Sequence, residues 1–205
     1  NNSVNKKIIE FTVGDDRLND LYLIKYDIKA SISHAKMLYR SNLLSEIECD
    51  KIINILNEIL SQAEAGELKI EKEFEDMHSK IEYILTDKLG DIGKKIHTAR
   101  SRNDQVLVSI QLYLIDELNF IKTEVKSLFD LLINLAKKNK NIIMPGYTHM
   151  RAAMPSSFGL WFSAYAEILI DDVISLNSSI EIINQNTLGS AAGYGTSFNI
   201  DRDFT

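Results

Sequence analysis

The sequence predicts an all-α protein in which a small N-terminal helical domain precedes the long helices of a helical bundle. The 205 residues include only two prolines and nine glycines, so helix-breaking residues are scarce. No glycine or proline interrupts the chain between Gly93 and Pro145. Apolar residues recur at steps of three and four, the spacing of a helix with one buried stripe.

Three helices are predicted in the first half of the chain. One apolar stripe comprises Leu18, Leu21, Ile24, Ile28, Ile32, Ala35 and Tyr39. A second helix is expected to begin at Ser45, because Ser45 and Glu48 have the spacing of a capping box. The third carries Met77, Ile81, Ile84 and Leu85 on one face.

Two much longer helices are predicted in the second half. The first runs from Val106 to Ala136, which at 1.5 Å per residue is on the order of 50 Å. The other runs from about Ser156 to Ile183 and carries a cluster of aromatic residues around Trp161. Helices this long usually pack in bundles, and the aromatic cluster has more apolar bulk than one neighbour would cover. We therefore expect association with other subunits.

Composition excludes several classes of protein. The net charge of -6 and pI of about 5.3 argue against a nucleic-acid binder that depends on phosphate contacts. No apolar run approaches the roughly 20 residues of a membrane span. One cysteine and four scattered histidines lack the spacing of metal ligands. The composition predicts a cytoplasmic protein without metal or cofactor.

A polar block directly precedes the first long helix. His97 to Gln105 reads HTARSRNDQ, in which arginines supply positive charge and Ser101 and Asn103 supply neutral donors. The following helix N-terminus adds free N–H groups, so the block could bind a carboxylate or phosphate. The alternative is a helix start capped by Ser101 or Asn103, with two solvated arginines.

Two further polar segments contain histidines. Thr148 and His149 lie in a segment that we expect to form a loop tightened by Pro145 and Gly146. A histidine there could act in acid–base chemistry, or it could have only a structural role. His78 follows Glu75 and Asp76 at a predicted helix start, where it could be no more than a neighbour of the cap.

These segments together resemble the argininosuccinate lyases of the fumarase/aspartase superfamily. HTARSRNDQV at residues 97–106 resembles the family's first characteristic block, and Glu-Asp-Met-His at residues 75–78 its preceding Glu-Asp-x-His element. Pro-Gly-Tyr-Thr-His at residues 145–149 resembles the second block, and residues 186–190 a later Asn-Pro-Leu-Gly-Ser segment. The order and spacing match along nearly the whole chain.

The resemblance implies a reversible β-elimination that splits argininosuccinate into arginine and fumarate, without metal or organic cofactor. It assigns Ser101, Asn103 and Thr148 to the substrate carboxylates, with Arg102 near them. It makes His149 a partner in proton transfer or in orienting the acid–base group, and it places His78 beside the substrate. It also implies a homotetramer in which active sites are shared between subunits.

The same resemblance suggests a division of the chain. Residues 1–95 would form the N-terminal domain, and residues 96–205 the first part of the central bundle. The family's third block, a Gly-Ser-Ser loop that supplies the catalytic serine, does not occur before Thr205. We therefore expect a fragment of the enzyme, and residues 1–205 alone to be inactive.

Two departures leave other interpretations open. Arg151 and Met154 stand where the family usually has glutamine, so a glutamine's role cannot be carried over to either position. A sister lyase that releases fumarate from another substrate is one alternative. A non-catalytic helical scaffold derived from the family is the other.

Overall fold

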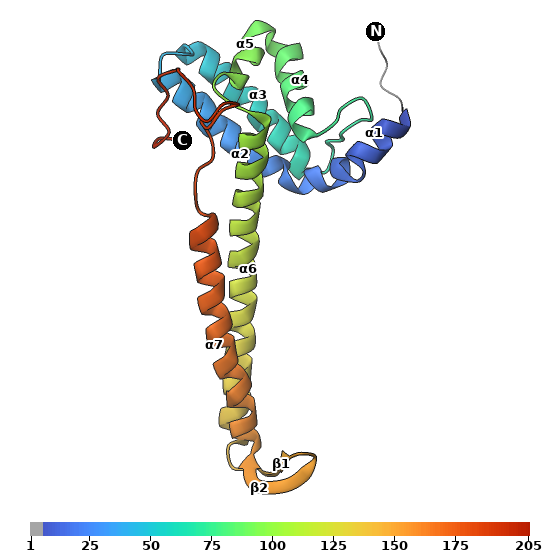
Figure 1. Cartoon of the computed structure of the whole chain (residues 1–205), viewed down its shortest axis with the longest axis vertical. Helices are drawn as coiled ribbons and strands as arrows, with labels where there is room; N and C mark the ends of the chain where they lie inside the picture. The colour runs from blue at the N-terminus through green and yellow to red at the C-terminus, as the bar shows by residue number, and fades with distance from the viewer. Residues whose placement is uncertain (1–5) are drawn as a thin grey trace. The chain divides into compact units, whose positions relative to one another are not determined.

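The computed structural model describes residues 6–205, which form the predicted all-α fold (Figure 1). Its elements are α1 (Lys6–Val13), α2 (Asp16–Arg40), α3 (Glu46–Glu64), α4 (Met77–Leu89), α5 (Asp91–Lys94), the 3-10 helix η1 (Lys95–His97), α6 (Arg102–Asn139), β1 (Ile143–Thr148), β2 (Arg151–Ser157) and α7 (Phe158–Ile183). The first five residues of the predicted N-terminal domain lie outside the described part.

The chain divides into two compact units. Unit 1 comprises residues 1–113 and 186–205, and unit 2 comprises residues 114–185. Unit 2 is thus inserted between two stretches of chain that fold together. The boundary expected after residue 95 from the family resemblance stays a prediction.

The core of unit 1 lies between α2, α3 and α4. The predicted capping box starts α3, because Ser45 Oγ accepts a hydrogen bond from the Glu48 N–H and the Glu48 carboxylate accepts one from the Ser45 N–H. Each helix turns its apolar stripe inward, which removes that surface from water. The fully buried core residues include Ile28, Leu38, Ile52, Leu56 and Leu85.

The C-terminal stretch of unit 1 is irregular but is tied to the helices of the same unit. Leu188 is buried against Ala30 and Val108. The Ala191 N–H donates to Asp104 Oδ2 at 2.7 Å, and Arg202 Nε donates to the carbonyl of Leu188 at 3.2 Å. The bond to Asp104, together with one from Thr187 Oγ1 to the Asp104 carbonyl at 3.2 Å, holds residues 187–191 against the first turn of α6.

Unit 2 consists of the remainder of α6, a β-hairpin and α7. Ser157 caps α7 by accepting a hydrogen bond from the Leu160 N–H at 3.1 Å. Gly159 lets the start of α7 approach α6 closely, since a Cβ there would lie 2.6 Å from the Cα of Lys140. No helix among residues 6–205 is long and apolar enough to cross a membrane.

The loop expected around Pro145 is instead an antiparallel hairpin, so that expectation was wrong. β1 pairs with β2, with Pro145 opposite Pro155 and Thr148 opposite Arg151. Two features hide these strands in the sequence. Proline is disfavoured in strands, and the turn uses His149 and Met150, at φ 49° and 64°, where glycine or asparagine is usual.

Candidate active site

The Ser-Arg-Asn block lies where α6 begins. Ser101 is the residue before the helix, and its Oγ accepts a hydrogen bond from the Asn103 N–H at 3.3 Å. Ser101 and Arg102 are half-buried, and Asn103 is exposed. The block therefore places a hydroxyl, a guanidinium and an amide at the positive end of a long helix, an arrangement suited to an anion.

Arg102 reaches towards α4 as well as to the surface. Its Nη1 lies 3.5 Å from Asp76 Oδ1 and its Nη2 lies 3.6 Å from Glu82 Oε2. Nη2 is also 3.4 Å from the hydroxyl of Ser79, the residue after His78. The structure thus brings the Arg102 side chain to the first turn of α4, where the Glu-Asp-x-His element ends.

Arg100 takes a different position, although it is only two residues away. Its side chain is buried, and its Nη1 donates to the hydroxyl of Ser31 at 2.8 Å. Burial lowers the pKa of the Arg100 guanidinium, and Asp27, Glu82 and Asp104 act in the opposite direction. Its charge acts inside unit 1, so the picture of two solvated arginines was wrong for Arg100.

His78 is also buried, with only 2% of its surface exposed. Its Nδ1 lies 3.1 Å from Asp27 Oδ1 on α2 and 3.5 Å from Gln105 Nε2 on α6. Asp76 caps α4 directly before it by accepting a hydrogen bond from the Ser79 N–H at 2.7 Å. His78 therefore follows the cap of α4 and also links three helices.

Thr148 and His149 lie at the tip of the hairpin in unit 2. Thr148 ends β1 and His149 is the first residue of the turn, and both side chains are exposed. The structure brings His78 and Arg102 to neighbouring positions in unit 1. It places Thr148 and His149 in unit 2, and the roles of all six predicted residues stay predictions.

No role was predicted for Asp27 or Gln105, although the Asp27-x-x-x-Ser31 spacing is similar to family positions and Gln105 belongs to the first characteristic block. A usable signal was present on α2, because Asp27, Ser31 and His34 recur at helical steps on its buried face. Polar residues on a buried stripe need partners, and such groups often belong to functional networks. Within residues 6–205, no group of three or more histidine, cysteine or acidic residues is arranged to hold a metal ion.

Comparison with known proteins gives concordant matches. A family model described as lyase matches residues 11–205. An argininosuccinate lyase of Phocaeicola vulgatus is 52% identical over 202 residues, which are 98% of this chain and 45% of that protein. The argininosuccinate lyase of Thermotoga neapolitana is 47% identical over 203 residues, 99% of this chain and 51% of that protein.

Solved structures share the fold. An EDDS lyase variant with bound fumarate has a TM-score of 0.81 and 23% identity, covering 99% of this chain and 40% of its own. A fumarate lyase:delta crystallin from Brucella melitensis bound to cobalt has a TM-score of 0.78 and 19% identity, covering 96% and 46%.

The chain spans about half the length of the curated relatives that it matches. The resemblance to argininosuccinate lyases is confirmed over essentially all of the chain's own length. The solved structures share its helical fold, and the family match over residues 11–205 shows that the chain belongs to the lyase family.

Proposed function

We propose that the chain belongs to an argininosuccinate lyase, which cleaves argininosuccinate reversibly into arginine and fumarate. The observation that carries the proposal is the Ser101–Asn103 block at the start of α6, in a chain about 50% identical to argininosuccinate lyases. The reaction would break a carbon–nitrogen bond.

The proposed β-elimination needs hydrogen-bond donors and positive charge of the kind that this block provides. A base removes a proton from the carbon beside a succinyl carboxylate, and an aci-carboxylate with two negative charges forms before the C–N bond breaks. Donors fixed in advance stabilise such charge best. Ser101 and Asn103 would donate to a substrate carboxylate, and Arg102 would add positive charge.

The hairpin would supply two further groups. Thr148 would donate to a substrate carboxylate, and His149 would take part in proton transfer or orient the group that does. The exposure of both side chains leaves them free to meet substrate. His78 would act beside the substrate from unit 1.

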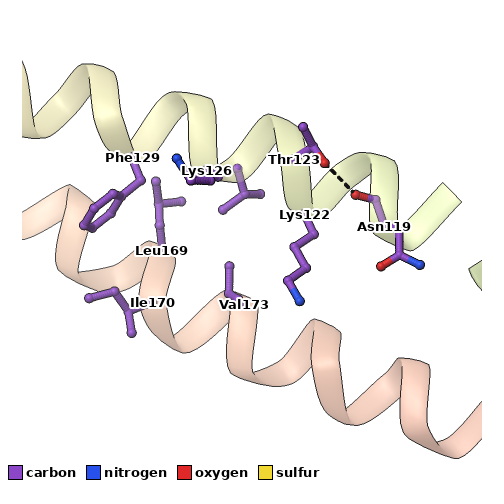
Figure 2. Close-up of a pocket in the computed structure, with 9 residues that line it drawn as sticks. Asn119, Lys122, Thr123, Lys126, Phe129, Leu169, Ile170 and Val173 are labelled. Carbon is purple, nitrogen blue, oxygen red and sulfur yellow. Dashed lines mark hydrogen bonds between the residues drawn. The ribbon is translucent and has the colours of Figure 1, made fainter. Parts of the chain in front are cut away.

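We further propose that the protein is a homotetramer with active sites shared between subunits. Unit 2 contains an apolar groove between its part of α6 and α7, to which Phe129, Leu169, Ile170 and Val173 contribute (Figure 2). Many large apolar residues of α7 are also exposed, including Trp161, Tyr165, Ile168 and Ile174. Exposed apolar surface of this kind is typical of protein interfaces.

The test is fumarate release by the purified protein at its natural length, followed by ultraviolet absorbance. Argininosuccinate and adenylosuccinate are supplied in parallel, and extract from a host lacking its own lyases is the control. Turnover of argininosuccinate alone is expected. Turnover of adenylosuccinate would identify a sister lyase instead, and a folded protein inactive on both substrates would favour the scaffold.

A further inference from the structure

A carboxylate buried in unit 1 faces the ring of His78. Asp27 on α2 has no exposed surface, and His78 on α4 has almost none. Asp27 Oδ1 lies 3.1 Å from His78 Nδ1. A buried carboxylate at this distance from a ring nitrogen fixes both the orientation of the ring and the nitrogen that carries the proton.

A third helix contributes to the same contact. Gln105 Nε2 on α6 donates to Asp27 Oδ1 at 3.3 Å and lies 3.5 Å from His78 Nδ1. The amide nitrogen and a protonated Nδ1 are both donors, and one carboxylate oxygen can accept from both. The shorter, charge-assisted contact favours a proton on Nδ1 that is donated to Asp27. Nε2 is then the acceptor of the ring.

Two arginines act on the Asp27 carboxyl without a direct ion pair to it in the described part of the chain. Burial raises the pKa of the Asp27 carboxyl, while Arg100, the hydrogen bond from Gln105 and Arg102 lower it. Arg100 bonds to Ser31, which lies one helical turn after Asp27. The effect of burial is the largest, so the pKa of the Asp27 carboxyl lies above its ordinary value, and the nearby positive charge limits that rise. The ionised carboxylate is the form that accepts from Nδ1.

The contact also reaches the block proposed to bind substrate. Gln105 lies in the first turn of α6, and its N–H donates to the carbonyl of Ser101 at 3.2 Å. Asp27 thus holds, through Gln105, the turn that presents Ser101 and Asn103. Its second oxygen, Oδ2, has no hydrogen-bond partner in the described part of the chain.

We propose that Asp27 is a positioning residue that holds His78 as the Nδ1–H tautomer, with Nε2 as acceptor, and fixes the first turn of α6 through Gln105. The tautomer follows from the geometry of unit 1. The importance of the tautomer for turnover rests on the proposed lyase function.

The first experiment reads the tautomer by long-range proton–nitrogen NMR of the histidine rings in the natural-length protein. The signal of His78 is identified by its loss in His78→Gln. A pyrrole-like Nδ1 and a pyridine-like Nε2 are expected at neutral pH. A protonated Nε2 with a bare Nδ1 would overturn the proposal without any change at Asp27.

The second experiment compares Asp27→Asn with a matched control. Asp27→Asn is expected to produce a substantial Nε2–H population at His78, and to lower kcat/KM on the order of 10- to 100-fold through misplacement of the site. The control is Asp20→Asn, also on α2, whose carboxylate accepts from the Met77 N–H at 2.9 Å without bonding to His78. The control should leave the tautomer unchanged.

An Asp27→Asn protein with the wild-type His78 spectrum would refute the positioning role. A wild-type protein that releases no fumarate would refute the proposed function instead, while its NMR spectrum would still decide the tautomer. The two failures are thus distinguishable. A variant that does not fold leaves the wild-type spectrum as the deciding measurement.

Discussion

Two arginines of one short block have opposite environments, and the difference arises from partners far away in sequence. Arg100 is buried against Ser31, whereas Arg102 is only half-buried and contacts residues of α4. The sequence indicated a charged block and the start of a helix. It could not indicate which arginine is buried, because burial depends on α2 packing against this block.

Protonation of His34 should make the protein sensitive to acid. Burial, and next the charge of Arg100, lower the pKa of His34 from 6.5 to about 3, and Nε2 donates to the Thr98 carbonyl at 2.9 Å. Between pH 3 and pH 6.5, His34 is protonated in the unfolded chain but not in the folded chain. The free energy of unfolding therefore falls as the pH falls below 6.5. From pH 7.5 to 5.0 the loss is about 2 kcal/mol.

Urea unfolding at the two pH values, in wild type and His34→Gln, measures this contribution. The loss of unfolding free energy on acidification should be smaller in His34→Gln by about 2 kcal/mol. His97→Gln, which changes an exposed histidine, serves as the control and should keep the wild-type loss. Equal losses in His34→Gln and wild type would contradict the prediction.

At the scale of elements, helices α2, α3, α4, α6 and α7 were predictable because their signals are local, whereas α1 and the short α5 were not predicted. The capping box of α3 and the apolar stripes of α2, α4, α6 and α7 are all visible in the sequence. Helix α6 begins at Arg102, before the first apolar residue of its predicted stripe at Val106. The hairpin was missed, since its strands carry prolines and its turn lacks glycine, and only pairing between β1 and β2 identifies them.

Removing the cap of α3 should lower the free energy of unfolding by a measurable amount. Ser45→Ala deletes the hydroxyl that accepts from the Glu48 N–H at 3.3 Å. The expected loss of unfolding free energy is about 1 kcal/mol, measured by chemical denaturation at neutral pH.

Ser61→Ala is the matched control on the same helix. Ser61 Oγ donates to the carbonyl of Asn57 within α3, and alanine favours helix more than serine does. The control should therefore be neutral or slightly stabilising. A loss at Ser61 as large as the loss at Ser45 would show that the cap is not the cause.

At the scale of the whole molecule, unit 2 exposes apolar residues that its own helices do not cover. The sequence indicated excess apolar bulk near Trp161, and the structure leaves Trp161, Tyr165 and Ile168 exposed. The protein surface that covers them could be inferred only from the family resemblance. An apolar stripe in a sequence indicates that a helix face is buried, but it does not indicate which surface buries it.

A charge placed in the groove of unit 2 should weaken the proposed tetramer. Ile170→Asp puts a carboxylate beside Leu169 and Val173 (Figure 2), where association would bury it at a large cost. Sedimentation velocity is expected to show smaller species than in wild type. Ser178→Asp, an exposed position of α7 outside the groove, should sediment as wild type does. A monomeric wild type would refute the tetramer itself.

The insertion of unit 2 into unit 1 has a consequence for the order in which the chain can fold during synthesis. Unit 1 needs Leu188 and the residues after it to cover Ala30 and Val108. Roughly 70 residues of unit 2 must first leave the ribosome, at about 5–20 residues per second. For several seconds, therefore, a nascent chain exposes an apolar patch that Leu188 and the residues after it will close, and a chaperone has time to bind there.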